Sequence, residues 1–147
     1  MKPSDIQDAL VAALAARYPA FTVEAHGGLF TEREAPFLLS KAPAILAACV
    51  ALPGLTPAGL NKWRSALRWG LFVLGSDADG RERDDVALDT VFDLLLWLPG
   101  QRWGLPEAKL PDLTSFTADN LYTGSLNHLR VALWGVRWEQ TFTFTVP

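Results

Sequence analysis

The chain has 147 residues, of which 50% are hydrophobic and 20% are charged, a composition typical of one globular domain with a sizeable core. Its formal net charge of −3 argues against a dedicated nucleic-acid binder, because phosphate recognition needs a basic surface. Cys49 is the only cysteine, which excludes an internal disulfide and a cysteine-rich zinc site. The aromatic share of 11%, with six tryptophans, favours β structure or interfaces.

The N-terminal segment predicts an amphipathic helix. Ser4 and Gln7 have the spacing of a capping box at a helix start, and Pro19 ends the helical pattern. We expect the apolar face of this helix to cover a sheet. Apolar side chains recur at helical spacing at Ile6, Leu10, Ala13 and Leu14.

Two segments are apolar enough to raise the question of a signal peptide or a membrane span. Asp5 and Asp8 interrupt the first segment, at the N-terminus, and its apolar positions are spaced rather than continuous. The second segment, residues 42–60, carries no charge, but prolines and glycines break it. We therefore expect a soluble, intracellular protein.

The first half of the chain then predicts three strands. A short strand over 21–25 is followed by a loose, charged loop around 26–41. Residues 44–52 are apolar on both faces, as in a central strand. A connection rich in proline and glycine, 53–62, leads to a third strand over 63–75, where large apolar residues alternate with arginine and small residues.

The second half predicts one helix and two or three strands. Residues 85–98 have helical periodicity and stop at a Pro-Gly pair. A strand is expected over 113–123, and a long alternating strand or strand pair over 126–146. A strand of that length exceeds the usual size for one domain, so we expect it to bend or break. Gly135 is a candidate bulge within it.

The order of elements predicts an α+β fold with a single domain over residues 1–147. Helices separated by groups of strands favour a mostly antiparallel sheet of about five or six strands. We expect the two helices to pack on one face of that sheet.

The residues that carry chemistry in enzymes are sparse and scattered. His26 and His128 are the only histidines, and the chain has no G-x-S-x-G sequence. The acidic stretch 77–85 does not match a calcium loop, because the fifth and sixth positions are Arg81 and Glu82. We therefore predict no catalytic residue, no cofactor and no metal, and a protein that is not an enzyme.

Charged side chains follow one face of two of the predicted strands. Arg64 and Arg68 share a face of the third strand, and Arg137 shares a face of the terminal strand with Glu139. If these strands pair, opposite charges meet across the sheet. Two interpretations remain open, a solvated outer face and a docking surface.

Aromatic rings beside breaks in the pattern are candidates for an interface. Trp63, Trp103 and Tyr122 lie next to such breaks, where an exposed ring suits the core of an interface. The complete set of residues that we predict at an interface is Arg33, Trp63, Arg64, Arg68, Trp103, Arg137, Glu139, Thr141 and Thr143.

The terminal strand alternates between two kinds of residue. We expect the first kind to lie in the core beneath the helices: Trp134, Val136, Trp138, Phe142 and Phe144. We expect the second kind on the open face: Arg137, Glu139, Thr141, Thr143 and Thr145. Gln140 interrupts the apolar phase, and we interpret it as the place where the strand leaves the core.

The order of these elements resembles that of a bacteriophage family. The chain resembles the small neck and tail proteins of long-tailed phages and Mu-like prophages, in particular the tail terminator or tail completion group. The resemblance is carried by a capped helix, strands of the type "APAILAACVAL" and "RWGLFVLG", a helix "LDTVFDLLLWL" and the C-terminal sequence "ALWGVRWEQTF". The resemblance covers nearly the whole chain and includes V-x-W-x-Q-x-F, Val136 to Phe142.

This resemblance implies a structural virion protein without chemistry. Tail terminators form a ring, usually a hexamer, that caps the tail tube at the neck and joins it to the head connector, with DNA only as passing cargo. It also implies that the loop from Gly27 to Lys41 orders against the tube. The alternative is a small-ligand binder or enzyme whose sheet curls around a pocket lined by Trp134 and Trp138.

Overall fold

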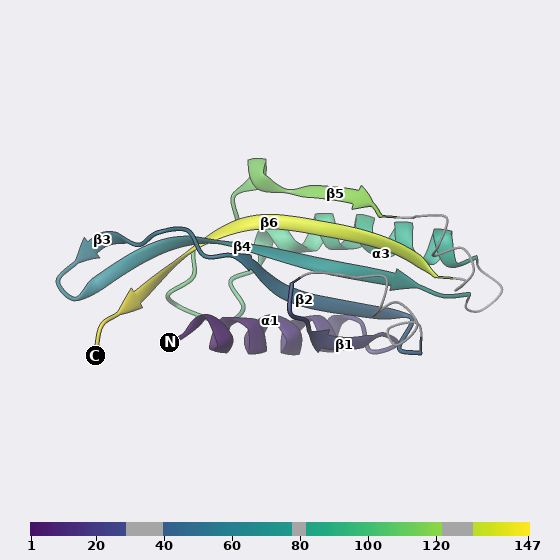
Figure 1. Cartoon of the computed structure of the whole chain (residues 1–147), viewed down its shortest axis with the longest axis horizontal. Helices are drawn as coiled ribbons and strands as arrows, with labels where there is room; N and C mark the ends of the chain where they lie inside the picture. Colours follow the sequence, from purple (N-terminus) through teal and green to yellow (C-terminus); the bar gives the residue numbers. More distant parts are fainter. Residues whose placement is uncertain (29–39, 78–81, 122–130) are drawn as a thin grey trace.

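A six-stranded sheet and two helices form the described part of the computed structural model (Figure 1). The described residues are 1–28, 40–77, 82–121 and 131–147. All but one of the strand pairings are antiparallel, which confirms the predicted α+β class with a mostly antiparallel sheet. The helices are α1 (Pro3–Arg17) and α3 (Arg83–Trp97). The strands are β1 (Thr22–Ala25), β2 (Ala44–Ala51), β3 (Thr56–Gly59), β4 (Lys62–Gly75), β5 (Thr117–Asn120) and β6 (Ala132–Thr145).

The two longest strands, β4 and β6, form the centre of the sheet, in the order β1-β2-β4-β6-β5 with β3 on the outer part of β4. They pair without a register shift from Lys62, opposite Thr145, to Gly75, opposite Ala132. The predicted bulge at Gly135 is therefore wrong. A Cβ added at this glycine would lie 3.0 Å from the end of the Leu121 side chain, which would have to shift slightly to accommodate it. β6 is unbroken and bends along its length, as expected (Figure 1).

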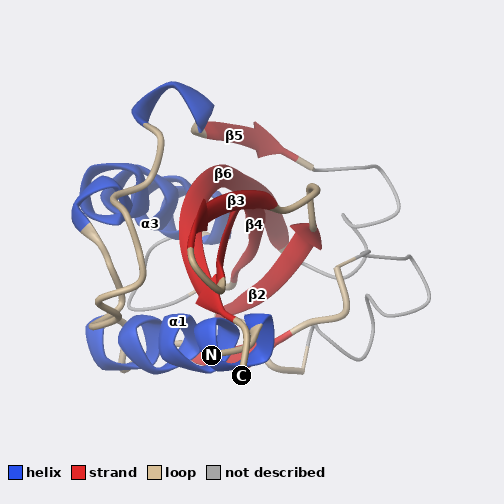
Figure 2. Ribbon diagram, turned by 90° about the vertical axis from the view of Figure 1, so that its left-hand side faces the viewer, coloured by secondary structure: helices blue, strands red, loops and turns tan. Residues whose placement is uncertain are grey.

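Both helices pack on one face of the sheet, as predicted (Figure 2). Helix α1 lies over β1 and β2, whereas α3 lies over the two central strands. The predicted core residues of β6 lie between the helices and the sheet. Trp134 and Phe144 are half-buried at the border of this core. The core includes Ile6, Leu10, Leu14, Leu67, Trp69, Val91, Leu94, Val136, Trp138 and Phe142.

Helix α1 begins earlier than predicted and has a different cap. Pro3 is its first residue, and the backbone N–H of Lys2 donates a hydrogen bond of 2.7 Å to the Asp5 carboxylate. Proline suits this position because the first helical residue has no intrahelical N–H partner. The predicted capping box of Ser4 and Gln7 is therefore wrong.

One strand, β3, lies inside the segment that we predicted to be only a connection. Its Pro57 is tolerated because β3 pairs with β4 alone. Leu60 and Asn61 form the turn to β4, where Asn61 has a φ of 56°. In Figure 1 this hairpin and the end of β6 extend beyond the helices. We call this part, residues 55–64 and 143–146, the arm.

The predicted strand over 113–123 is shorter in the structure. A 3-10 turn occupies Leu113–Ser115, where the Asp112 carboxylate accepts a hydrogen bond from the Thr114 N–H. Strand β5 starts only at Thr117. A capping aspartate thus delays the strand by folding the chain locally.

Candidate functional site

The sheet face opposite the helices carries most of the residues that we predicted at an interface. We call it the open face. Strand register places Arg64 opposite Thr143, Arg68 opposite Glu139, and Gly70 opposite Arg137. Because side chains alternate between faces, all the charged residues in these pairs lie on one side of the sheet. The structure therefore brings Arg64, Arg68, Arg137, Glu139, Thr141 and Thr143 together.

Two ion pairs cross the strands of the open face. Arg68 Nε lies 3.4 Å from Glu139 Oε2, and Arg137 Nη2 lies 3.6 Å from Asp119 Oδ2 on β5. These groups are largely solvent-exposed, so each pair contributes less than about 1 kcal/mol to the free energy of unfolding. The predicted charge complementarity across the sheet is confirmed for these two pairs.

A shallow groove of about 630 Å³ lies over this face. Gly70, Gly135, Val50 and Leu121 are among the residues that line it. A Cβ added at Gly70 would lie 3.0 Å from the Val50 side chain, and one added at Gly135 would lie 3.0 Å from the Leu121 side chain. Among the described residues, no group of three or more His, Cys, Asp or Glu side chains is placed to hold a metal ion. The groove therefore offers apolar contact and paired charges, and its described lining suggests no particular reaction.

Gln140 is a buried polar centre of the main core. Its side-chain oxygen accepts a 2.9 Å hydrogen bond from Trp103 Nε1, and its nitrogen donates to the carbonyls of Lys109 at 2.7 Å and Gln101 at 3.0 Å. The residue is 1% exposed, so the interpretation that β6 leaves the core here is wrong. The sequence showed that Gln140 is a polar residue at an apolar position of the strand, which indicated a polar site. Nothing in the sequence indicated that its hydrogen-bond partners lie in the connection 101–109.

Trp103 lies in the core instead of at the surface. It is 8% exposed and its φ is 57°, so the expectation of an exposed ring at this position is wrong. The hydrogen bond to Gln140 and edge contact with Trp97, at 5.9 Å between ring centroids, hold it there. Trp63, by contrast, is exposed, as predicted.

The tryptophans proposed to line a pocket are core residues. Trp138 is buried and stacks on Phe116 with centroids 6.0 Å apart, while Trp134 is half-buried against the same core. The buried polar side chains in the described part of the chain are Ser65, Thr90 and Gln140, none of which is charged. The packing of Trp134 and Trp138 is therefore that of core residues that stabilise the fold.

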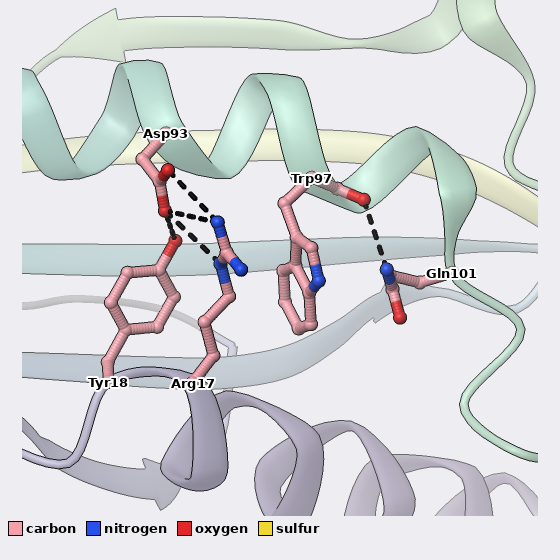
Figure 3. A network of polar contacts seen from close by, with 5 residues as sticks. All are labelled: Arg17, Tyr18, Asp93, Trp97 and Gln101. Atoms are coloured by element: carbon pink, nitrogen blue, oxygen red, sulfur yellow. Dashed lines mark hydrogen bonds and ion pairs between the residues drawn. The ribbon is translucent and has the colours of Figure 1, made fainter.

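A polar network joins the end of α1 to α3 (Figure 3). Asp93 accepts hydrogen bonds from Arg17, at 3.0 Å, and from the Tyr18 hydroxyl, at 2.5 Å. The Arg17 guanidinium also lies over the Trp97 ring, 5.0 Å from its centroid. Burial, followed by the hydrogen bond to Asp93, raises the pKa of Tyr18. We interpret this network as a clamp between the helices.

Two exposed apolar surfaces were not predicted as such. The first is on α3, where Leu88, Phe92 and Leu96 are all exposed on the side away from the core; we call it the α3 ridge. The second is at the arm, where Leu60, Trp63 and Val146 are exposed; we call it the arm tip. Apolar residues at Leu88, Phe92 and Leu96 were visible in the sequence, but the broad apolar helix gave no sign of which side stays uncovered.

Several predicted features lie outside the described residues. These are Arg33, Tyr122, His128 and most of the loop around 26–41. His26 is described, and its Nδ1 accepts a hydrogen bond of 3.1 Å from the Gly28 N–H while its ring contacts Phe72.

Comparison with known proteins adds no family to this description. The chain matches no family model, and no curated protein matches it. None of the helices in the described ranges is long and apolar enough to cross a membrane.

Proposed function

We propose that this chain is a structural virion assembly protein of the tail terminator kind, which forms a homo-oligomeric ring, caps a tail tube and joins it to a head connector. The observation that carries the proposal is the pair of exposed apolar surfaces, the α3 ridge and the arm tip, at separate places on one small chain. Contiguous apolar surface on a soluble protein usually marks an interaction site.

The separation of the two surfaces supports a ring rather than a simple dimer. A two-fold dimer uses the same patch on both copies, whereas a ring joins one patch of each copy to a different patch of the next. The α3 ridge and the arm tip differ in shape, because one is a helix face and the other is the end of a hairpin. Two unlike surfaces are what a cyclic arrangement requires.

The open face supports the same proposal in a second way. Two of its arginines lie beside carboxylates, in the pairs Arg68–Glu139 and Arg137–Asp119. A ring around passing DNA should not hold phosphates tightly, since each uncompensated cation on its surface strengthens salt-dependent binding. Paired charges give a polar surface with little net attraction for DNA.

The experiment that tests the proposal combines electron microscopy with sedimentation. The purified protein is examined across a concentration series, with and without the tail tube protein encoded in the same genome. We expect rings that cap the tube ends and limit tube length. A protein that stays monomeric at every concentration and never caps the tube would contradict the proposal.

A further inference from the structure

We propose that the arm tip of one copy packs on the α3 ridge of a second copy. This inference depends on the proposed function and adds the two surfaces that would meet between neighbours. The partner is thus another molecule of this chain. The shape of the ridge, the composition of the arm tip and the charges on α3 and on the arm favour this contact.

The α3 ridge is a continuous apolar strip. Leu88, Phe92 and Leu96 are spaced four residues apart, so their side chains lie one above another on the same side of the helix. Phe92 is 63% exposed and Leu96 is 70% exposed. The opposite side of α3 already packs on the sheet through Val91 and Leu94. The side chains of the ridge are therefore not needed to pack α3 on the sheet.

The arm tip exposes apolar side chains at the end of a hairpin. Leu60, in the two-residue turn, is 91% exposed. Trp63 pairs opposite Phe144, and the N–H of Val146 donates a 2.8 Å hydrogen bond to the Asn61 carbonyl. This pairing fixes the backbone of the arm, which extends beyond the end of the helices (Figure 1).

Opposite charges flank the two surfaces. Lys62 is exposed at the start of β4, next to the turn that carries Leu60. Arg64 follows on the same face of the strand, which is the face opposite to that of Trp63. Asp84 and Asp85 are exposed in the first turn of α3, next to the ridge. A basic apolar tip and an acidic apolar helix complement one another, and such charges favour the correct partner over like-charged alternatives.

The position of the surfaces requires two copies. The arm extends from one end of the molecule, whereas α3 lies along the sheet behind it (Figure 1). The contact therefore joins different patches of successive copies. Repetition of such a contact gives a ring if the rotation closes and a filament if it does not.

The first test is cross-linking between differently labelled copies. Two variants are made in a Cys49→Ala background, one with Leu60→Cys and a tagged chain with Phe92→Cys, and a short bismaleimide joins thiols that lie near each other. We expect a heterodimeric product that contains one chain of each kind. The matched control replaces Phe92→Cys by Leu113→Cys, a residue that is 72% exposed elsewhere on the chain. Cross-linking that is no stronger with Phe92→Cys than with Leu113→Cys would overturn the proposed contact.

The second test exchanges the charges. Lys62→Glu and Asp85→Lys should each raise the dissociation constant for self-association about fivefold, as expected for the loss of one favourable charge pair. The double variant should recover most of that loss. Asp8→Lys, on the exposed side of α1, is the control for net charge. Additive losses in the double variant, or an equal loss from Asp8→Lys, would contradict the contact.

The outcomes separate this inference from the proposed function. Rings that cap tubes without the Leu60–Phe92 product would retain the function and reject the contact. The product without rings or capping would retain the contact and reject the tail terminator role. A chain that is monomeric at all concentrations and gives no product would reject both. Denaturant unfolding of each variant confirms that a lost product reflects the contact and not an unfolded chain.

Discussion

At the scale of single residues, Gln140 has the most demanding environment in the fold. Its side chain satisfies the Trp103 indole N–H and the carbonyls of Gln101 and Lys109 inside the core. Gln140→Leu would keep much of the volume but leave these three groups without a partner. Because each buried polar group that loses its hydrogen bond is costly, we expect the free energy of unfolding to fall by about 2–4 kcal/mol. Urea unfolding followed by tryptophan fluorescence measures it.

Thr143→Val is the matched control for this change. Thr143 lies on the same strand and is half-buried, but on the open face, and valine keeps its β-branched shape. We expect a change within about 0.5 kcal/mol. Equal losses from Thr143→Val and Gln140→Leu would show that strand packing matters here, and that the polar network of Gln140 contributes nothing measurable.

Tyr18 makes stability depend on pH in the alkaline range. Burial and the hydrogen bond to Asp93 raise the pKa of its hydroxyl in the folded chain, whereas the pKa of an unfolded tyrosine is about 10. The folded state therefore holds this proton more tightly. The corresponding stability is complete below about pH 10 and is lost as the pH rises through the folded pKa. We expect the free energy of unfolding to be unaffected by this group below about pH 10 and to fall as the pH rises above it.

Tyr18→Phe isolates this contribution. The variant loses the bond to Asp93, so it should be less stable than the original chain at pH 8 by about 1 kcal/mol. Its curve should then be flatter at higher pH, because the titrating group is absent. Curves that stay parallel from pH 8 to pH 11 would exclude Tyr18 as the source of the pH dependence.

At the scale of elements, the contact between the end of β4 and the start of α3 depends on Gly75. A Cβ at this position would lie 2.4 Å from the Arg83 carbonyl oxygen and 2.9 Å from the Ala87 Cβ. Both neighbours belong to the first turns of α3, so the helix would have to move. We expect Gly75→Ala to lower the free energy of unfolding by about 1–3 kcal/mol, measured by urea unfolding.

Gly54→Ala is the control, since an added Cβ at Gly54 meets nothing within 4 Å. It should leave stability unchanged or raise it by up to about 1 kcal/mol, because alanine restricts the unfolded chain. A loss from Gly54→Ala as large as that from Gly75→Ala would mean that the close approach of α3 is not the cause.

Helices and strands whose apolar residues recur with a clear period could be predicted from the sequence. Elements in which apolar residues show little periodicity could not. Alternation over residues 63–75 and 132–145 identified β4 and β6, because most side chains on one face of each strand are buried. Strand β3 was missed because its four residues include Pro57 and Gly59, which are typical of loops. It is a strand only because β4 extends far enough to pair with it.

The same reasoning explains which parts of the candidate site were predictable. Alternation places the charges of the open face on one side of the sheet, so complementary charges could be expected if the strands paired. The register of the structure then identifies the particular pair, Arg68 with Glu139. The α3 ridge and the burial of Trp103 depend on which surfaces other segments cover. Coverage is a tertiary property, and neither periodicity nor residue type determines it.

At the scale of the whole molecule, the helices cover the body of the sheet and not the arm (Figure 1). Strand β3 pairs with β4 alone, so its amides are protected by a single hairpin. Local opening is easiest where few apolar contacts hold the backbone. We expect the amides of 56–59 to exchange with solvent faster than those of 67–74 in the isolated chain, and exchange to slow on the order of tenfold when copies assemble. Hydrogen exchange with mass spectrometry, at low and high protein concentration, measures both rates.

The internal reference for this measurement is β2, which lies between β1 and β4 in the sheet and whose first residues are buried. Assembly through the arm should leave exchange at Ala44–Ala47 of β2 unchanged, because the backbone of these residues is already paired with both β1 and β4. Residues of α3 around the ridge should be protected together with the arm, since the same contact covers both. A different result would be slower amide exchange on the open face alone, with exchange in the arm and α3 unchanged. That result would place the contact between copies on the open face and would contradict a contact between the arm tip and the ridge.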